Sequence, residues 1–174
     1  MTTLRWMLAV ALLAGCPGPA APPQPLEIGT HQSGDVFAPL VDGDLMAVVL
    51  GPNGLNMVVP SLRAIDVDPR APDPSVELEI GGVLMAADIE GSRVDMQPDD
   101  DGFVLWDLRV PFQVELCCYN CSSGTLRARL EDSSGLSFAG QVDIVVGRGE
   151  CPDADVCCQS ADLCPEPELA NLCP

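Results

Sequence analysis

The 174-residue chain contains no lysine, only one histidine and few aromatic residues. Its eight basic side chains are all arginine and face 26 acidic ones, which gives a formal net charge of −18. Nucleic-acid binding needs clustered cations, so this balance excludes that class of partner. Only His31 has an ordinary pKa near neutrality, so groups suited to acid–base catalysis are scarce. The length predicts one domain with short appendages.

The common catalytic and cofactor motifs are also missing. A phosphate-binding GxxxxGK[ST] loop cannot form without lysine. Gly135–Ala139 lacks the second glycine of a nucleophile elbow and lies in a strand–turn–strand context. His31 is expected in a polar loop, Gly29–Gly34, as an exposed side chain without a catalytic role. We therefore predict a protein that is not an enzyme and that uses no cofactor.

The chain begins with a sorting signal, predicted over residues 1–15. Arg5 is followed by the apolar run Trp6–Leu13, which has the length of a signal-peptide core and is far too short to span a bilayer. The next residues, Leu13-Ala14-Gly15-Cys16, resemble the lipobox of bacterial lipoproteins. The resemblance implies that the Cys16 thiol receives a diacylglycerol, that cleavage occurs before Cys16, and that the new amine is acylated.

The lipobox resemblance covers residues 1–16 and implies a location. Acyl chains contribute about 0.8 kcal/mol per buried methylene, and more than one chain gives stable anchoring. No later apolar run is long enough to span, so the lipid is the only expected membrane contact. Pro17, rather than aspartate, follows the cysteine. In the family this favours the outer membrane, on its periplasmic side or at the cell surface. Loss of Arg5 with the signal changes the side-chain total from −18 to −19.

Three segments are predicted after the signal: a lipidated, proline-rich tether at 16–25, a β body at 26–148 and a cysteine-rich tail at 149–174. Five of the nine residues from 17 to 25 are proline. Such a segment favours extended polyproline II, which rises about 3.1 Å per residue, so the tether would reach roughly 28 Å.

The body has the pattern of an all-β domain. Val76–Ile80, Leu126–Glu131 and Val142–Val146 alternate apolar with polar residues or carry β-branched runs, as half-buried strands do. Other predicted strands are Leu45–Leu50, Leu55–Val59, Leu62–Val67, Val83–Ile89, Phe103–Val110 and Gln113–Cys117. Turn signals separate them at Asp42-Gly43, Pro52-Asn53-Gly54, Asp101-Gly102 and Ser133-Ser134-Gly135.

This spacing predicts an antiparallel β-sandwich of about seven to nine strands. The stretch Gly124–Val146 resembles the last hairpin of immunoglobulin-like domains, which implies an immunoglobulin-like architecture for the body. Trp106, Phe103 and Phe112 are expected in or near the core. An exposed, ligand-stacking Trp106 is the alternative.

Eight cysteines accompany the lipidated Cys16, and an exported protein meets an oxidising compartment. Four disulfides are therefore predicted, with 105 possible pairings left open. We hypothesise that bridges attach the tail to the Cys117–Cys121 region. Cys118 and Cys121 form a CxxC, but a strand rather than a helix is expected after it, so a structural role is favoured over redox or metal chemistry. The eight are Cys117, Cys118, Cys121, Cys151, Cys157, Cys158, Cys164 and Cys173.

Metal ligands other than thiolates are weakly indicated. Gln97 and Leu108 occupy the first and last positions of an EF-hand register that requires Asp and Glu there, so a true EF-hand is rejected. A looser calcium site would use Asp99 and Asp101.

The sequence favours a non-catalytic envelope lipoprotein that acts as a binding, adhesive or structural module. Its partner would be an unknown envelope protein or ligand, either basic or bridged by calcium because the body is acidic. The alternative is an envelope hydrolase, or a metal-handling or redox protein, that uses His31, acidic loops or the cysteine cluster.

Overall fold

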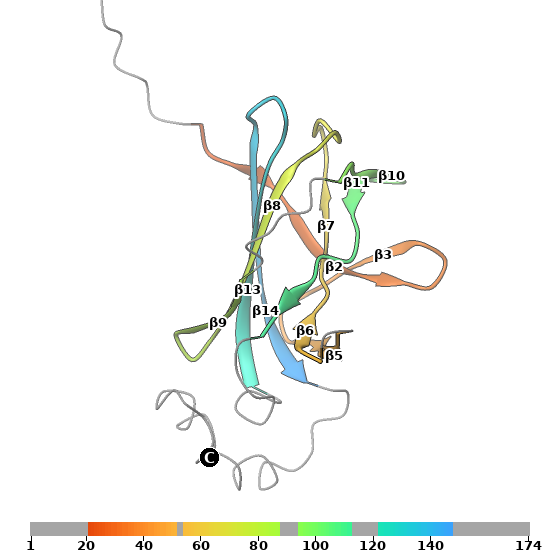
Figure 1. Ribbon diagram of the computed structural model, residues 1–174. Helices are drawn as coiled ribbons and strands as arrows, with labels where there is room; N and C mark the ends of the chain where they lie inside the picture. Colours follow the sequence, from red (N-terminus) through yellow and green to blue (C-terminus); the bar gives the residue numbers. More distant parts are fainter. Residues whose placement is uncertain (1–20, 52–53, 88–93, 113–121, 148–174) are drawn as a thin grey trace, which may run out of the picture.

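The computed structural model describes residues 21–51, 54–87, 94–112 and 122–147, and the regular elements in these ranges are all β-strands (Figure 1). The first seven strands are β1 (Gln24–Pro25), β2 (Glu27–Gln32), β3 (Val36–Pro39), β4 (Asp44–Ala47), β5 (Val49–Leu50), β6 (Asn56–Val58) and β7 (Ser61–Ala64). The other seven are β8 (Asp73–Ile80), β9 (Val83–Ala87), β10 (Gln97–Asp99), β11 (Gly102–Leu105), β12 (Val110–Pro111), β13 (Ser122–Glu131) and β14 (Ser137–Gly147). Within the described ranges no helix is long and apolar enough to cross a membrane.

The largest sheet is built around the hairpin of β13 and β14. Its order is β1-β14-β13-β8-β9, with β4 also paired to β14. Both β1 and β4 run parallel to β14, β1 beside its first residues and β4 beside its last ones. The body therefore has two distinct ends along β14. The tether end carries β1 and the Asp132–Leu136 turn, and the distal end carries the last residues of β4 and β14.

Two further sheets complete the body, in the orders β10-β11-β7-β2-β3 and β12-β6-β5. Buried side chains from all three sheets form one hydrophobic cluster. In β8, Val76, Leu78 and Ile80 are completely buried, whereas Glu77 between them is exposed. The alternation that predicted these strands thus reports which face meets the core.

The all-β prediction is confirmed for the described residues, as is the hairpin predicted at Gly124–Val146. The predicted strand count of seven to nine is too low, because 14 strands, many of two to four residues, form in the described ranges. The predicted strand Leu45–Leu50 is split at Val48, where the chain passes from the first sheet to the third. Phe103–Val110 is split into β11 and β12, and Asp107 between them has a left-handed φ of 55°.

Other strands were not predicted because their sequences are polar. The expected loop Gly29–Gly34 is wrong for its first four residues, because His31 lies in β2 and pairs with Phe37 of β3. The reversal starts only at Ser33. The predicted tether also continues into the fold, since Gln24 and Pro25 pair with β14 as β1. The predicted strand Gln113–Cys117 and the last residues of Val83–Ile89 lie outside the described residues.

Candidate functional site

The single histidine belongs to an aromatic and acidic cluster on the second sheet. His31 lies in β2, and Trp106 directly follows β11. The centroids of their two rings are 4.5 Å apart. Phe37 of β3 pairs with His31, and the centroid of its ring lies 6.3 Å from that of Trp106. Trp106 is half-buried, and the ring that it contacts is the His31 side chain of this protein.

Two carboxylates engage the two nitrogens of His31. Its Nδ1 lies 3.0 Å from Oδ2 of Asp107, and its Nε2 lies 3.2 Å from Oδ1 of Asp35. Both aspartates have a left-handed φ of 55°, a conformation that aspartate tolerates better than most residues. The hydrogen bond to Asp107 is the main cause that raises the pKa of His31. Partial removal from water lowers this pKa, and Asp35 raises it further.

The hydrogen bonding of His31 bears on the hydrolase alternative. A general base needs a free ring nitrogen to take a proton from a nucleophile. Both nitrogens already face carboxylates, and the nearby Ser61 hydroxyl is buried and accepts a hydrogen bond from the Asp107 N–H. His31 and Ser61 are therefore not arranged as a base and its nucleophile in this structure.

Arg63 of β7 forms ion pairs with Glu27, Asp99 and Asp101 beside this cluster, and we call these four residues the acidic corner. Its Nε lies 2.6 Å from Glu27, its Nη1 lies 3.1 Å from Asp99 and 3.4 Å from Asp101, and its guanidinium stacks 4.5 Å from the Phe37 ring centre. Partial burial lowers the pKa of Arg63, but the hydrogen bonds to Glu27 and Asp99 outweigh burial and raise it. The side chain is only 12% exposed, so it is a fixed part of the fold.

The weak calcium candidates lie in this corner. Asp99 ends β10, Asp101 is in the turn before β11, and both face the Arg63 guanidinium. An open hollow beside them is lined by Gly34, Asp35, Val36, Phe37, Arg63, Pro98, Asp99, Asp100 and Asp101. In the described ranges no three His, Cys, Asp or Glu side chains are grouped to hold a metal. The cation that Asp99 and Asp101 face in this structure is therefore the Arg63 guanidinium.

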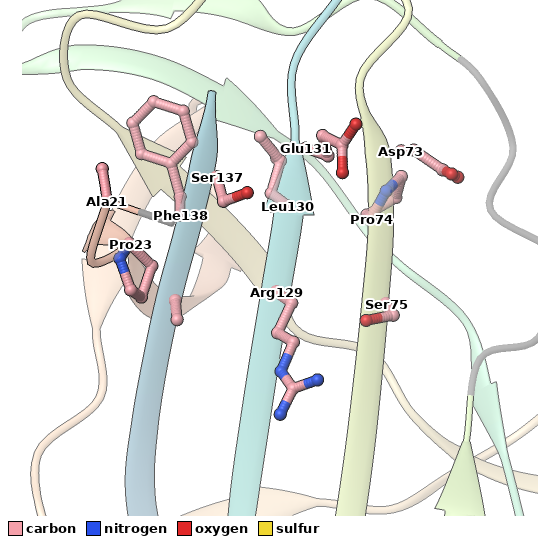
Figure 2. A pocket seen from close by; sticks show the side chains of 11 residues that line it. Ala21, Pro23, Asp73, Pro74, Ser75, Arg129, Leu130, Glu131, Ser137 and Phe138 are labelled. Carbon is pink, nitrogen blue, oxygen red and sulfur yellow. The ribbon is translucent and has the colours of Figure 1, made fainter. Parts of the chain in front are cut away.

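A second hollow lies at the tether end of the largest sheet. Figure 2 shows Arg129 and Ser75 from the neighbouring strands β13 and β8, with Ala21 and Pro23 beside β14. Within the described residues no carboxylate forms an ion pair with the exposed Arg129. Arg127, two residues earlier, pairs instead with Glu79 at 2.8 Å.

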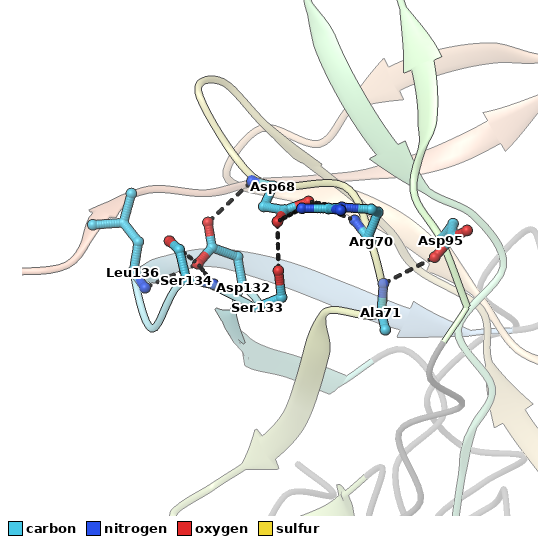
Figure 3. A network of polar contacts seen from close by, with 8 residues as sticks. All are labelled: Asp68, Arg70, Ala71, Asp95, Asp132, Ser133, Ser134 and Leu136. Carbon is cyan, nitrogen blue, oxygen red and sulfur yellow. Dashed lines mark hydrogen bonds and ion pairs between the residues drawn. The ribbon is translucent and has the colours of Figure 1, made fainter.

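A polar network centred on the buried Asp132 also lies at the tether end (Figure 3). Asp132 is 6% exposed and accepts hydrogen bonds from the backbone N–H groups of Asp68, Ser134 and Leu136 and from the Ser134 hydroxyl. Burial raises the pKa of Asp132, but these donors lower it below its ordinary value. The Arg70 guanidinium, and then the Ser133 hydroxyl, hold the pKa of Asp68 well below its usual range.

Among the predicted aromatic core residues, Phe112 is buried and Phe103 packs against the cluster. Sequence reasoning missed Arg63, Asp107 and Asp132. Asp132 had a usable signal, since an Asp-Ser-Ser-Gly turn offers a carboxylate to following N–H groups. Cys16 and the eight predicted disulfide cysteines lie outside the described residues.

Comparison with known proteins gives no family. No protein-family model matches the chain, and no curated protein matches it. One similar solved structure is the N-terminal domain of PorA, at 14% sequence identity and a TM-score of 0.26. The match covers 72% of this chain and 99% of that one. At such a TM-score the likeness carries no argument about function.

Proposed function

We propose that this protein is a non-catalytic, lipid-anchored lipoprotein of the bacterial cell envelope whose body binds a partner. The main support combines the lipobox-like sequence with the position of β1. The lipobox-like Leu13–Cys16 stands only eight residues before Gln24, where β1 already pairs with β14. Extended chain of that length reaches about 25 Å, so a lipid on Cys16 would hold the tether end of the body close to the membrane.

An immunoglobulin-like β-sandwich is the architecture that we propose for the body. Its support is the single hydrophobic cluster shared by all three sheets and the outward placement of polar residues on β8 and β13. In such a body the end that carries the last residues of β4 and β14 would face away from the membrane, because β1 marks the lipid end. Pro17 after the cysteine favours an outer-membrane location in this interpretation.

The surface that best fits a partner is the acidic hollow beside Arg63. Asp35, Asp99, Asp100 and Asp101 line it together with that single cation. A chain of charge −18 attracts basic groups and repels anionic ones. We therefore propose a protein partner that presents arginine or lysine, with a calcium-bridged contact as the competing version.

The anchor is tested by replacing Cys16 in the native host. Cys16→Ser should move the protein from the membrane fraction to the aqueous fraction and abolish incorporation of labelled fatty acid, because the thioether to lipid cannot form. Gly15→Ala is the matched control, since it keeps a small residue before the cysteine and should leave both readouts unchanged. An unchanged membrane fraction for Cys16→Ser would refute the lipid anchor.

The partner is tested separately by crosslinking intact cells and purifying the protein. A variant with Asp99→Asn and Asp100→Asn should lose the captured partner, whereas Glu77→Gln on the largest sheet should retain it. Equal capture by both variants would remove the acidic hollow from the proposal. Repeating the capture with a calcium chelator separates a basic partner, which stays bound, from a calcium-bridged one.

A further inference from the structure

The hollow at the tether end of the largest sheet is lined by charges of both signs, and we call it the tether-end hollow. Its lining residues come from β8, β13, β14 and the segment directly before β1. Figure 2 shows Glu131 and Asp73 toward one end of the hollow and Arg129 toward the other. Its volume of about 630 Å³ is that of an ordinary small-molecule site. A ligand that fills it meets one cation and two carboxylates.

The strand register explains why Arg129 is available to a ligand. Residues that pair directly across strands share one face of a sheet, and the partners of Arg129 are Ser75 on β8 and Ala139 on β14. Two residues earlier on β13, Arg127 forms an ion pair with Glu79 of β8. No described carboxylate does the same for Arg129. Its exposed guanidinium therefore lies between two short side chains, and together with the Ser75 hydroxyl it can donate hydrogen bonds to a phosphate.

The other end of the hollow attracts a cation. Glu131 of β13 lies directly opposite Asp73 of β8, and both side chains are exposed. Like charges in this position destabilise a sheet, so an ammonium group between the two carboxylates would relieve their repulsion. Within the described ranges neither acid forms an ion pair. Along β13, Glu131 lies two residues beyond Arg129, a Cα separation of about 7 Å.

We propose that the tether-end hollow binds the phosphoethanolamine headgroup of a membrane lipid, with its phosphate on Arg129 and Ser75 and its ammonium between Glu131 and Asp73. A two-carbon bridge separates the phosphate from the ammonium, as the sheet separates Arg129 from the two acids. A free amino acid carries both charges on one carbon and spans less of this separation. Phosphocholine has the same bridge, but its methylated nitrogen has no N–H to donate to the carboxylates.

The location of the hollow favours a lipid over a soluble ligand, and this step rests on the proposed lipid anchor. Ala21 and Pro23 line the hollow, and Ala21 follows Cys16 by five residues. Five residues of extended chain span at most about 18 Å, so a lipid on Cys16 would hold the hollow within that distance of its attachment point. The charge of −18 repels anionic lipids, whereas a phosphoethanolamine headgroup carries no net charge.

A soluble headgroup tests the site without a membrane. NMR titration of the full chain with Cys16→Ser, using glycerophosphoethanolamine, should give saturable shifts of amide signals in β8 and β13. Arg129→Gln should weaken this binding at least tenfold by removing the phosphate contact, and Asp73→Asn combined with Glu131→Gln should do so by removing the ammonium contact. Arg109→Gln is the matched control, because Arg109 is exposed in the loop after β11 and its loss changes the net charge equally.

Two results of the titration would overturn the site. One is the absence of localised shifts in the parent chain. The other is binding that Arg129→Gln leaves unchanged or that glycerophosphocholine reproduces. Failure of the lipid anchor cannot affect this experiment, because Cys16 is already replaced. Loss of the proposed anchor and loss of the proposed site are therefore distinguishable.

Photo-crosslinking tests whether the ligand is a lipid. The protein is purified from the membrane fraction with Cys16 intact and placed on vesicles of equal parts phosphatidylethanolamine and phosphatidylcholine. A photo-crosslinking amino acid at Ser137, which lines the hollow, should attach to phosphatidylethanolamine. The same group at Val36, exposed on β3 of the second sheet, should give at least tenfold fewer such adducts. Equal adducts at the two positions, or attachment only to phosphatidylcholine, would overturn the lipid as the occupant.

Discussion

Two polar clusters of this body use aspartate in opposite ways. Asp132 is buried and receives four hydrogen bonds, three of them from backbone N–H groups: two in its own turn and one in the loop after β7. His31 is surface-exposed and lies between Asp35 and Asp107, two side chains that are themselves exposed. The first cluster connects the β13–β14 turn to the loop after β7 (Figure 3), and the second connects two loops at the surface.

The difference teaches where charge stabilises this acidic protein. A buried carboxylate with both oxygens engaged is strongly coupled to folding, because removing it leaves several partly buried N–H groups without their acceptor. An exposed ion pair competes with water and salt and contributes little. We therefore expect the Asp132 cluster to determine stability and the His31 cluster to make it depend weakly on pH. Substitutions in these clusters and in the Arg63 network test this ranking.

The largest effect is expected for Asp132→Ala. It removes the acceptor for three backbone N–H groups and a hydroxyl, so the free energy of unfolding should fall by about 3 kcal/mol. Urea unfolding of the oxidised Cys16→Ser form measures this change. Asp100→Ala is the matched control, because Asp100 is exposed in a turn and should change stability by less than about 0.5 kcal/mol. Equal effects of the two variants would abolish the distinction between buried and exposed carboxylates.

Much of the fold could be predicted from the sequence, and the failures have physical causes. Strands with one buried and one solvent-exposed face, such as β8, β13 and β14, can be predicted because apolar and polar residues alternate along them. β2 and β3 were not predicted, because they include Thr30, His31 and Pro39, residues that are common in loops. Where a strand changes sheet, as at Val48, the apolar run continues and hides the break.

The candidate site was less predictable than the fold. His31, Trp106, Asp99 and Asp101 were recognised one at a time as chemically distinctive residues. Nothing local indicates that Arg63 lies between Glu27 and Asp99, because each pair is 36 residues apart and meets only through strand pairing. The Asp107 contact to His31 spans 76 residues. Site geometry here is a property of register, which periodicity alone does not fix.

An intermediate effect is expected for Arg63→Ala. The change leaves Glu27, Asp99 and Asp101 facing one another and removes the guanidinium from the Phe37 ring, so stability should fall by about 2 kcal/mol. Arg129→Ala is the matched control, since that guanidinium is exposed and makes no ion pair with the described residues. If Arg129→Ala lowers the free energy of unfolding as much as Arg63→Ala does, the ion pairs of Arg63 contribute no stability beyond that of any positive charge on this acidic protein.

The smallest effect, and the one with a defined pH window, is expected at His31. A raised pKa means that the folded state binds a proton more tightly than the unfolded state, whose pKa is about 6.5. The contribution is therefore fully present below pH 6.5 and is lost as the pH rises through the higher folded-state value. Urea midpoints of the parent and His31→Asn should differ more at pH 5.5 than at pH 9. A difference that grew with pH would contradict the assigned contacts.

The single imidazole also lets the two carboxylates be ranked directly. NMR titration follows one histidine signal without ambiguity, because the chain contains no other histidine. Asp107→Asn should lower the pKa of His31 more than Asp35→Asn does, since the hydrogen bond to Asp107 is the larger cause of the increase. The reverse order would place the imidazole nearer the β2–β3 turn. Such an exposed pair would then be a feature of one hairpin and would not join the loop after β11 to β2.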